Sequence, residues 1–191
     1  MFDPALKFLL DTAFGLLTYA FLLRFVMQWL RAPFRNPVGH ALTAATDWAV
    51  KPLRRALPGF RGVDWATLLL AWIAQFAWLA AVALALGGAG FDGTVLLTLA
   101  LLAVVMLVRA ALWLLIVAVF VQAVLSWVAP DGPLAGLLNA LTYRFLTPIR
   151  RRVPPLGGTL DLSPLIVIVL AQLALMLPLQ WLERMVFELF R

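Results

Sequence analysis

Two basic loops hold the side chains best suited to binding anionic groups. The first contains Pro52-Leu53-Arg54-Arg55 with Pro58 after it, and the second contains Pro148-Ile149-Arg150-Arg151-Arg152 with Pro154 after it. A guanidinium group is planar, permanently charged and rich in N–H donors, so neighbouring arginines can bind phosphate or carboxylate oxygens. Because both loops keep the same spacing, we predict a paired basic platform for anionic lipid or for an acidic protein partner. The alternative interpretation is that the arginines only fix the orientation of the chain in a membrane, which needs charge but not spacing.

Each basic loop is followed by an aspartate and then by a glutamine. Asp64 and Asp161 come after the second proline of their loops, and Gln75 and Gln172 each lie 11 residues further on. The aspartates are expected to cap the helices that follow, and each could also pair with the first arginine of its loop. Four loop prolines are expected to turn the chain and so present the arginines: Pro52, Pro58, Pro148 and Pro154. The same order of residue types twice in one chain indicates a duplicated helix–loop–helix unit.

Some polar side chains fall inside apolar segments, where a lone charge costs about 2.5–3.5 kcal/mol on insertion scales. Asp11 and Arg109 occupy equivalent positions in the two units, so we expect an ion pair between the units. A proton or ion relay is the alternative role. Gln75 and Gln172 are expected to join helices through hydrogen bonds or to line a polar pathway. Arg24, near the end of its segment, is expected to extend its charge to the membrane surface.

The composition excludes several classes of protein. Of 191 residues, 64% are hydrophobic and 13% are charged, which favours a membrane protein over a water-soluble domain. The chain has no cysteine and a single histidine, His40, so we expect no disulfide, metal site or other cofactor. It also lacks a phosphate-binding loop and a Ser/His/Asp set, so we do not expect an enzyme. The net charge of +6 favours anionic lipid rather than nucleic acid, because no nucleic-acid motif accompanies it.

Four apolar segments are long enough to cross a membrane. We predict spans at about residues 4–30, 65–86, 94–128 and 163–182, followed by a short amphipathic tail. The third is too long for one simple span, because a helix of that length measures ~50 Å against ~30 Å of hydrocarbon. Two spans would need ~40 residues at that thickness, so residues 94–105 are expected to form an extension that tilts, kinks or protrudes.

The predicted fold is therefore an all-α integral membrane protein made of two tandem repeats, residues 1–92 and 93–191. Each repeat has two spans joined by a basic loop that contains a short helix lying in the membrane interface. Lysine and arginine are concentrated in the two loops and absent from the 87–93 hairpin, so the loops should face the cytoplasm and both termini the outside. The two repeats then insert in the same direction and should be related by a pseudo-twofold axis along the membrane normal.

The two loops and their flanks resemble the YggT family of small bacterial membrane proteins with plastid relatives. The resemblance covers nearly the whole chain as two tandem domains. It is carried in the first unit by Gln28-Trp29, Asn36-Pro37, Thr46, Pro52-x-Arg54-Arg55, Pro58, Asp64 and Gln75. It is carried in the second by Ser126-Trp127, Pro133, Thr142, Pro148-x-Arg150-Arg151, Pro154, Asp161-x-Ser163-Pro164 and Gln172. The first unit departs from the pattern at Trp65-Ala66-Thr67, and the second has Gly132 where asparagine is expected.

The resemblance implies a location in the bacterial cytoplasmic (inner) membrane but no agreed activity. Relatives have been tied to cell division and chromosome partition, to osmotic or ion homeostasis, and in plastids to assembly of a membrane cytochrome complex. We expect a non-enzymatic scaffold or assembly factor that presents the basic loops to anionic phospholipid or to an unknown membrane or cytoplasmic protein. The alternative is a component of a small ion or osmolyte channel or transporter. Four spans leave little interior for a pore, so that alternative calls for a homo-oligomer.

Overall fold

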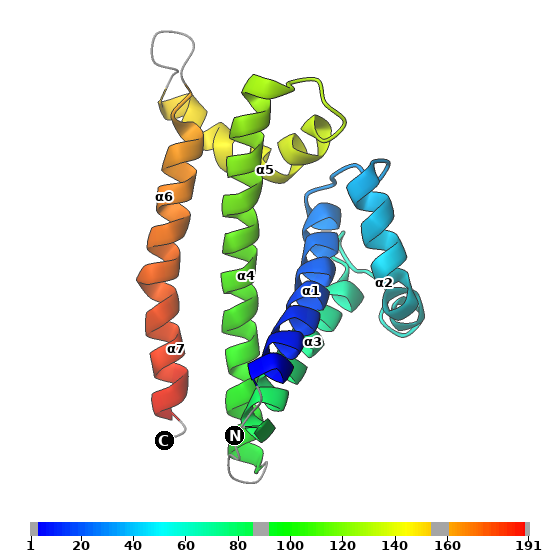
Figure 1. Cartoon of the computed structure of the whole chain (residues 1–191). Coiled ribbons are helices and arrows are strands. Elements are labelled where there is room, and N and C mark those ends of the chain that lie inside the picture. The colour runs from blue at the N-terminus through cyan, green and yellow to red at the C-terminus, as the bar shows by residue number, and fades with distance from the viewer. Residues whose placement is uncertain (1–3, 86–91, 154–160, 190–191) are drawn as a thin grey trace.

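The computed structural model describes residues 4–85, 92–153 and 161–189, and the described part is helical with no strand (Figure 1). Four segments are long and apolar enough to cross a membrane, which confirms the predicted fold class at that level and suits a multi-pass membrane protein. The helices are α1 (Pro4–Trp29), α2 (Pro37–Ala56), α3 (Trp65–Ala85), α4 (Gly93–Val128), α5 (Ala135–Arg152), α6 (Ser163–Met176) and α7 (Pro178–Leu189).

The last span is longer than predicted. The apolar segment runs from Ser163 to Val186 rather than to residue 182, because α7 begins at Pro178 and continues from α6 along the side of α4. The first residues of the expected amphipathic tail, 183–186, are thus part of this span. Proline suits the first turn of a helix, where its missing N–H has no intrahelical acceptor, so the chain restarts as a helix after a one-residue interruption.

The extension at residues 94–105 belongs to one unbroken helix. α4 has 36 residues and is ~54 Å long at ~1.5 Å per residue. Its first turns are fixed against α3 by a hydrogen bond of 3.1 Å from Trp72 Nε1 to the carbonyl oxygen of Ala100. Asp92 caps the helix by accepting a hydrogen bond from the backbone N–H of Val95.

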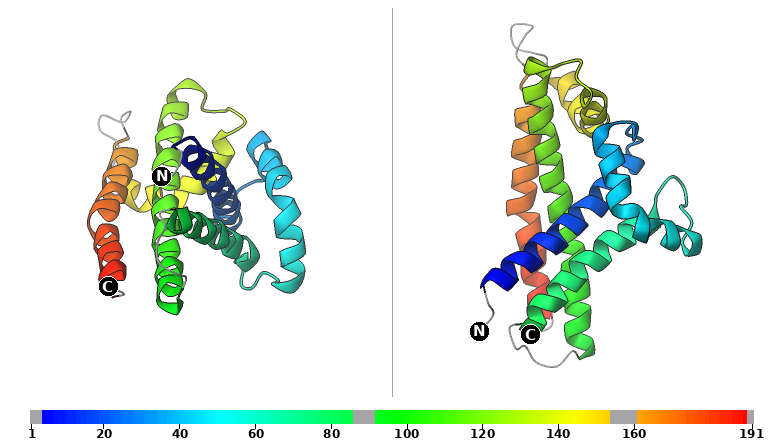
Figure 2. Two further views of the ribbon diagram at one scale, coloured as in Figure 1. Left: turned by 60° about the horizontal axis from the view of Figure 1, so that its bottom comes forward. Right: turned by 45° about the vertical axis from the view of Figure 1, so that its right-hand side comes forward.

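The spans alternate in direction around α4. Figure 1 shows α1 and α4 rising from the end where both termini lie, while α3 and the α6–α7 pair descend towards it. α4 contacts α1, α3, α5, α6 and α7, whereas α6 contacts only α4, α5 and α7 among the described helices. In Figure 2 α1 is strongly inclined to α4, while α6 and α7 lie along it. The pseudo-twofold axis and the boundary of the repeats at residue 92 stay predictions.

Three groups of buried apolar side chains hold these helices together. One joins α1, α3 and α4 around Phe21 and Ala71, and another joins α4, α5 and α6 around Val119 and Leu146. The third lies between the two units and combines Met27 of α1 with residues of α4 and α5. The loop helix α5 is therefore packed against α1 as well as against its own unit.

The two loop helices extend beyond their internal prolines. Pro52 and Pro148 were expected to turn the chain, but they lie inside α2 and α5, and this expectation is wrong. A proline removes one backbone hydrogen bond, and the next turn restores the pattern. The helices end at Ala56 and Arg152, and the next residues, Leu57 and Val153, donate their backbone N–H groups to carbonyls four residues earlier. Pro58 follows Leu57, the residue that caps the end of α2, whereas Pro154 lies outside the described residues.

Candidate functional site

The first arginine of the first basic loop is bound within the protein. Arg54 lies on the last turn of α2 and reaches Asp64, which directly precedes α3. Its Nη2 and Nε atoms lie 2.5 and 3.2 Å from Oδ2 of Asp64. Asp64 is only 7% exposed, and it also accepts hydrogen bonds from the hydroxyl and backbone N–H of Thr67. The pair therefore ties the end of α2 to the start of α3.

The second unit has the same connection in a more exposed form. Arg150 Nε donates a hydrogen bond of 2.8 Å to Oδ2 of Asp161, and Oδ1 of Asp161 accepts one of 2.9 Å from the backbone N–H of Ser163. The two charged side chains are 40% and 32% exposed, against 35% and 8% in the first unit. We call these two pairs, Arg54–Asp64 and Arg150–Asp161, the loop bridges.

The loop bridges also change the acidity of the aspartates. Burial alone would raise the pKa of Asp64, but hydrogen bonds from Arg54 and Thr67 outweigh it and hold that pKa below its usual range. At Asp161 burial is likewise outweighed, by hydrogen bonds from Ser163 and Arg150, and the pKa is lowered. Both aspartates are therefore charged at neutral pH and available as acceptors for the arginines.

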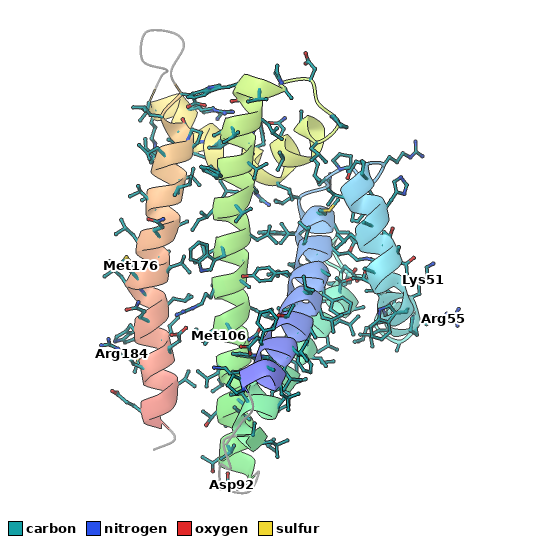
Figure 3. All side chains as sticks on the ribbon, in the orientation of Figure 1. Lys51, Arg55, Asp92, Met106, Met176 and Arg184 are labelled. Atoms are coloured by element: carbon teal, nitrogen blue, oxygen red, sulfur yellow. The ribbon has the colours of Figure 1, made fainter. Side chains whose placement is uncertain are left out.

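The remaining loop arginines point outward. Arg55, Arg151 and Arg152 are exposed and form no ion pair with the described residues. They lie at two separate places on the surface, because the ends of α2 and α5 lie on opposite sides of α4 (Figures 1 and 2). Figure 3 shows Arg55 on the outer side of α2, next to Lys51. We call these two places, Arg55 in the first loop and Arg151 with Arg152 in the second, the basic patches.

A second equivalent contact joins each loop helix to the first span of its unit. Arg24 of α1 donates a hydrogen bond of 2.5 Å to the hydroxyl of Thr46 and lies 2.8 Å from Asp47. Arg24 is only 4% exposed, so the expectation that it extends to the membrane surface is wrong. On α2 the buried hydroxyl of Thr46 and the partly exposed carboxylate of Asp47 contact its guanidinium group instead. Hydrogen bonds from Lys51 and Arg24 in turn lower the pKa of Asp47.

The second unit replaces this charged contact with a neutral one. Gln122 of α4 accepts a hydrogen bond from the hydroxyl of Thr142 on α5. Thr142 and its counterpart Thr46 are both 0% exposed. Each hydroxyl also contacts the carbonyl four residues earlier in its own helix. Gln122 further lines a cavity of about 350 Å³ between α4 and α5.

The intramembrane charges do not pair as expected. Asp11 accepts a hydrogen bond of 2.7 Å from Nε1 of Trp78 on α3, whereas Arg109 pairs with Glu183 on α7. The expected Asp11–Arg109 ion pair is therefore wrong, because α7 supplies the arginine with a nearer carboxylate. The two residues nevertheless line one cavity of about 290 Å³ between α1, α3 and α4.

This polar cavity, as we call it, also contains Gln75 and the hydroxyl of Thr18. Thr18 is 2% exposed, and its hydroxyl has no hydrogen-bond partner among the described residues. Nε of Arg109 is likewise buried without a partner there. Gln172, the counterpart of Gln75, lies elsewhere, on the exposed side of α6. The two glutamines thus do not share the symmetric packing position that the repeat suggested.

Several residues in these contacts were assigned no role from the sequence. Thr46 and Thr142 repeat at matching places, and that repetition was a usable signal for a contact shared by the two units. Glu183 lies just beyond the predicted end of the last span, so it was not considered as a partner for Arg109. Trp78 gave no signal, because nothing in the sequence distinguishes it from the other tryptophans of the spans.

The described residues contain no group of three or more histidines, cysteines and carboxylates that could hold a metal ion. The arrangement instead offers exposed guanidinium groups at the ends of the two loop helices and a polar cavity within the spans. Guanidinium groups can bind anions, and the cavity can hold water or a small polar solute.

Comparisons with known proteins agree with the sequence resemblance. The profile of the CCB3/YggT family matches the chain twice, at residues 4–85 and 101–182. An uncharacterized Pseudomonas aeruginosa protein is 37% identical over 166 residues, covering 85% of this chain and 82% of its own. An uncharacterized Vibrio alginolyticus protein, described by its place in the proC 3′ region, is 34% identical over 172 residues, covering 89% and 91%. No solved structure matches the chain.

The Escherichia coli K12 protein named YggT, also described as uncharacterized, is 35% identical over 167 residues, which cover 86% of this chain and 84% of that protein. These matches indicate no enzymatic family or fold. Since the family profile covers most of the chain and the relatives align over most of their length, the chain belongs to the CCB3/YggT family.

Proposed function

We propose that this protein is a non-enzymatic membrane scaffold whose cytoplasmic loops present the two basic patches to anionic lipid or to an acidic protein partner. The observation that carries the proposal is a difference between neighbouring arginines that is repeated in both loops. In both loops the first arginine is held by an aspartate of its own unit, and the second is exposed. The internal bridge holds the turn on which the exposed charge sits.

The separation of the basic patches limits the kind of surface that they fit. Because the basic patches lie on opposite sides of α4, they cannot both bind one small anion. They suit an extended anionic surface, such as a leaflet rich in acidic phospholipid or a long acidic face of a partner. Each arginine close to an anionic membrane surface contributes about 1 kcal/mol. The proposed setting is the bacterial inner membrane, with the loops in the cytoplasm and both termini outside.

A comparison of two charge-matched variants tests this proposal. Arg55→Gln/Arg151→Gln removes one exposed charge from each loop, and Arg54→Gln/Arg150→Gln removes the same number from the loop bridges. Cross-linking and recovery from native membranes should lose a protein partner in the first variant and keep it in the second wherever that variant stays folded. For lipid, the readout is enrichment of labelled phosphatidylglycerol around the reconstituted protein. Equal behaviour of wild type and the exposed-charge variant in both assays would reject the basic patches as a docking surface.

A second candidate function rests on the polar cavity. An aspartate, an arginine and a glutamine around one cavity inside the spans could carry an ion or a small polar solute, as in a component of a channel or transporter. Flux through liposomes containing the purified protein tests this. Asp11→Asn and Gln75→Leu should abolish such flux, while the exposed-charge variant should not affect it. Absence of flux for a panel of monovalent ions and zwitterionic osmolytes would leave the scaffold as the function.

A further inference from the structure

Gln172 lies on the outer side of the last span without a hydrogen bond to any described residue. It lies ~14 Å along α6 from Ser163, near the middle of a hydrocarbon layer of ~30 Å. The residue is exposed, unlike Gln75, which lines the polar cavity. Hydrocarbon chains offer no hydrogen bonds, so an amide at this depth needs a partner from another molecule.

Gln172 belongs to a continuous row of exposed side chains. Leu165, Val169 and Met176 are 59%, 46% and 62% exposed and are spaced from Gln172 by seven, three and four residues. Alternating steps of four and three residues are the pattern along which two helices pack side by side with a left-handed twist. We call the row Leu165, Val169, Gln172 and Met176 the Gln172 seam.

The Gln172 seam faces away from the rest of the protein. At 3.6 residues per turn it lies on the side of α6 opposite Val167 and Ala171, which are 5% exposed and buried towards α4. Figure 3 shows Met176 projecting from α6 away from α4. Figures 1 and 2 place α6 and α7 at the edge of the molecule, so no described helix covers the seam.

We propose that the Gln172 seam packs against the same seam of a second copy of this chain. A glutamine amide carries both donors and an acceptor, so two copies of Gln172 satisfy each other across a twofold axis. The other members of the seam are apolar and uncharged, so they can pack together without repulsion. An axis along the membrane normal keeps both copies in the same orientation. Arg184 lies on the same outer side (Figure 3), near the end of the span at Val186, where headgroups and water can solvate its charge.

The proposal is independent of the basic patches and of the polar cavity, and dilution in lipid tests it. The chain has no cysteine, so a single cysteine at Leu57 can carry a dye on the full-length protein. Energy transfer between labelled copies in liposomes, measured over a series of protein-to-lipid ratios, gives the dimerisation constant. Gln172→Leu should weaken dimerisation about 3- to 30-fold, the range expected for interhelical hydrogen bonds in membranes. Gln75→Leu, which changes the matching amide inside the cavity, should leave it unchanged.

Disulfide formation supplies a second test that does not depend on the glutamine. Met176→Cys places a cysteine on the seam, and Leu170→Cys places one at a residue that is 54% exposed but turned away from it. Only the first should form cross-linked dimers under mild oxidation. The proposal fails if the wild type is monomeric at every lipid ratio, if Gln172→Leu dimerises normally, or if both cysteines cross-link equally. It also fails if the seam cross-links to a different protein in native membranes while the purified chain stays monomeric.

Discussion

Replacement of Asp64 by alanine should destabilise the protein more than the same replacement at Asp161. Both aspartates begin a descending span and both accept a hydrogen bond from the first arginine of their loop. They differ in burial, since the Asp64 side chain is 8% exposed and the Asp161 side chain 32%. A comparison of the two variants therefore measures how much burial increases the contribution of the Arg–Asp pair to stability.

The structure allows the two effects to be estimated separately. Asp64→Ala removes a helix cap worth about 0.5–2 kcal/mol and charge-assisted hydrogen bonds worth about 1.5–3 kcal/mol. Because the Arg54 side chain is 35% exposed and can regain water, the expected loss is about 2–4 kcal/mol. Asp161→Ala breaks a pair between two side chains that are each about a third exposed, for which about 0–1 kcal/mol is usual, together with the hydrogen bond from the backbone N–H of Ser163. Asp161 does not cap α6, because Leu162 occupies the N-cap position. Its expected loss is about 1 kcal/mol.

Reversible unfolding in mixed micelles, driven by SDS and followed by helical circular dichroism, gives the free energies. Asp92→Ala serves as the control, because Asp92 caps α4 through the backbone N–H of Val95 and has no ion pair among the described residues. The loss for Asp64→Ala should exceed that for Asp161→Ala by at least about 1 kcal/mol, the lower limit of the difference estimated above. It should also exceed the loss for Asp92→Ala, which removes a cap alone. Equal losses at Asp64 and Asp161, or a loss at Asp64 no larger than at Asp92, would refute the importance of the buried loop bridge.

Other consequences can be checked with the same protein. The lowered pKa of Asp64 means that the unfolded chain takes up the proton first, so the free energy of unfolding should be constant above about pH 5 and fall below about pH 4, and Asp64→Asn should flatten that fall. Arg24→Gln, which copies the amide of the second unit, should cost about 1–2 kcal/mol less in unfolding free energy than Arg24→Leu, because the amide can still bond to the buried loop hydroxyl. Gly39→Ala should lower the free energy of unfolding by about 1–3 kcal/mol, since the added methyl group would lie 2.3 Å from the backbone oxygen of Phe34. Gly136→Ala should have no such effect, because its methyl group would meet nothing within 4 Å. A cysteine at Leu57 should react with impermeant maleimide only in inverted vesicles, and labelling in intact cells would reverse the proposed topology.

The spans could be predicted because their signal is additive. Each of the four apolar segments accumulates hydropathy over some 20 residues, so single polar residues such as Asp11 or Gln75 do not hide it. The start of α3 at Trp65 and the end of α4 at Val128 agree with the sequence prediction. The last boundary was missed because Glu183 and Arg184 resemble the end of a span. In the structure Glu183 is neutralised by Arg109 and remains within it.

Contacts between spans could not be predicted in the same way. Counting residues fixes the depth of a charge in the membrane, but the direction in which it points depends on the rotation and tilt of its helix. Asp11 and Arg109 were predicted to occupy equivalent positions, yet they bond to Trp78 and Glu183 on different helices. Gln75 and Gln172 differ in the same way, one lining the polar cavity and the other exposed. Equivalence in sequence therefore did not carry over to equivalence in surroundings.

The loop bridges change what the repeated Pro-x-Arg-Arg spacing means. The fixed spacing favoured binding of an external ligand over a role in membrane orientation alone. In the structure, however, the first arginine needs this spacing to form its loop bridge. Arg54 must reach Asp64 from the last turn of α2, and Arg150 must reach Asp161 from the last turn of α5. Only the second arginine, which is exposed in both loops, is left to bind an anionic group outside the protein. A test of docking must therefore change Arg55 and Arg151 alone, since a variant lacking all the arginines would also lose the bridges that hold the loops in place.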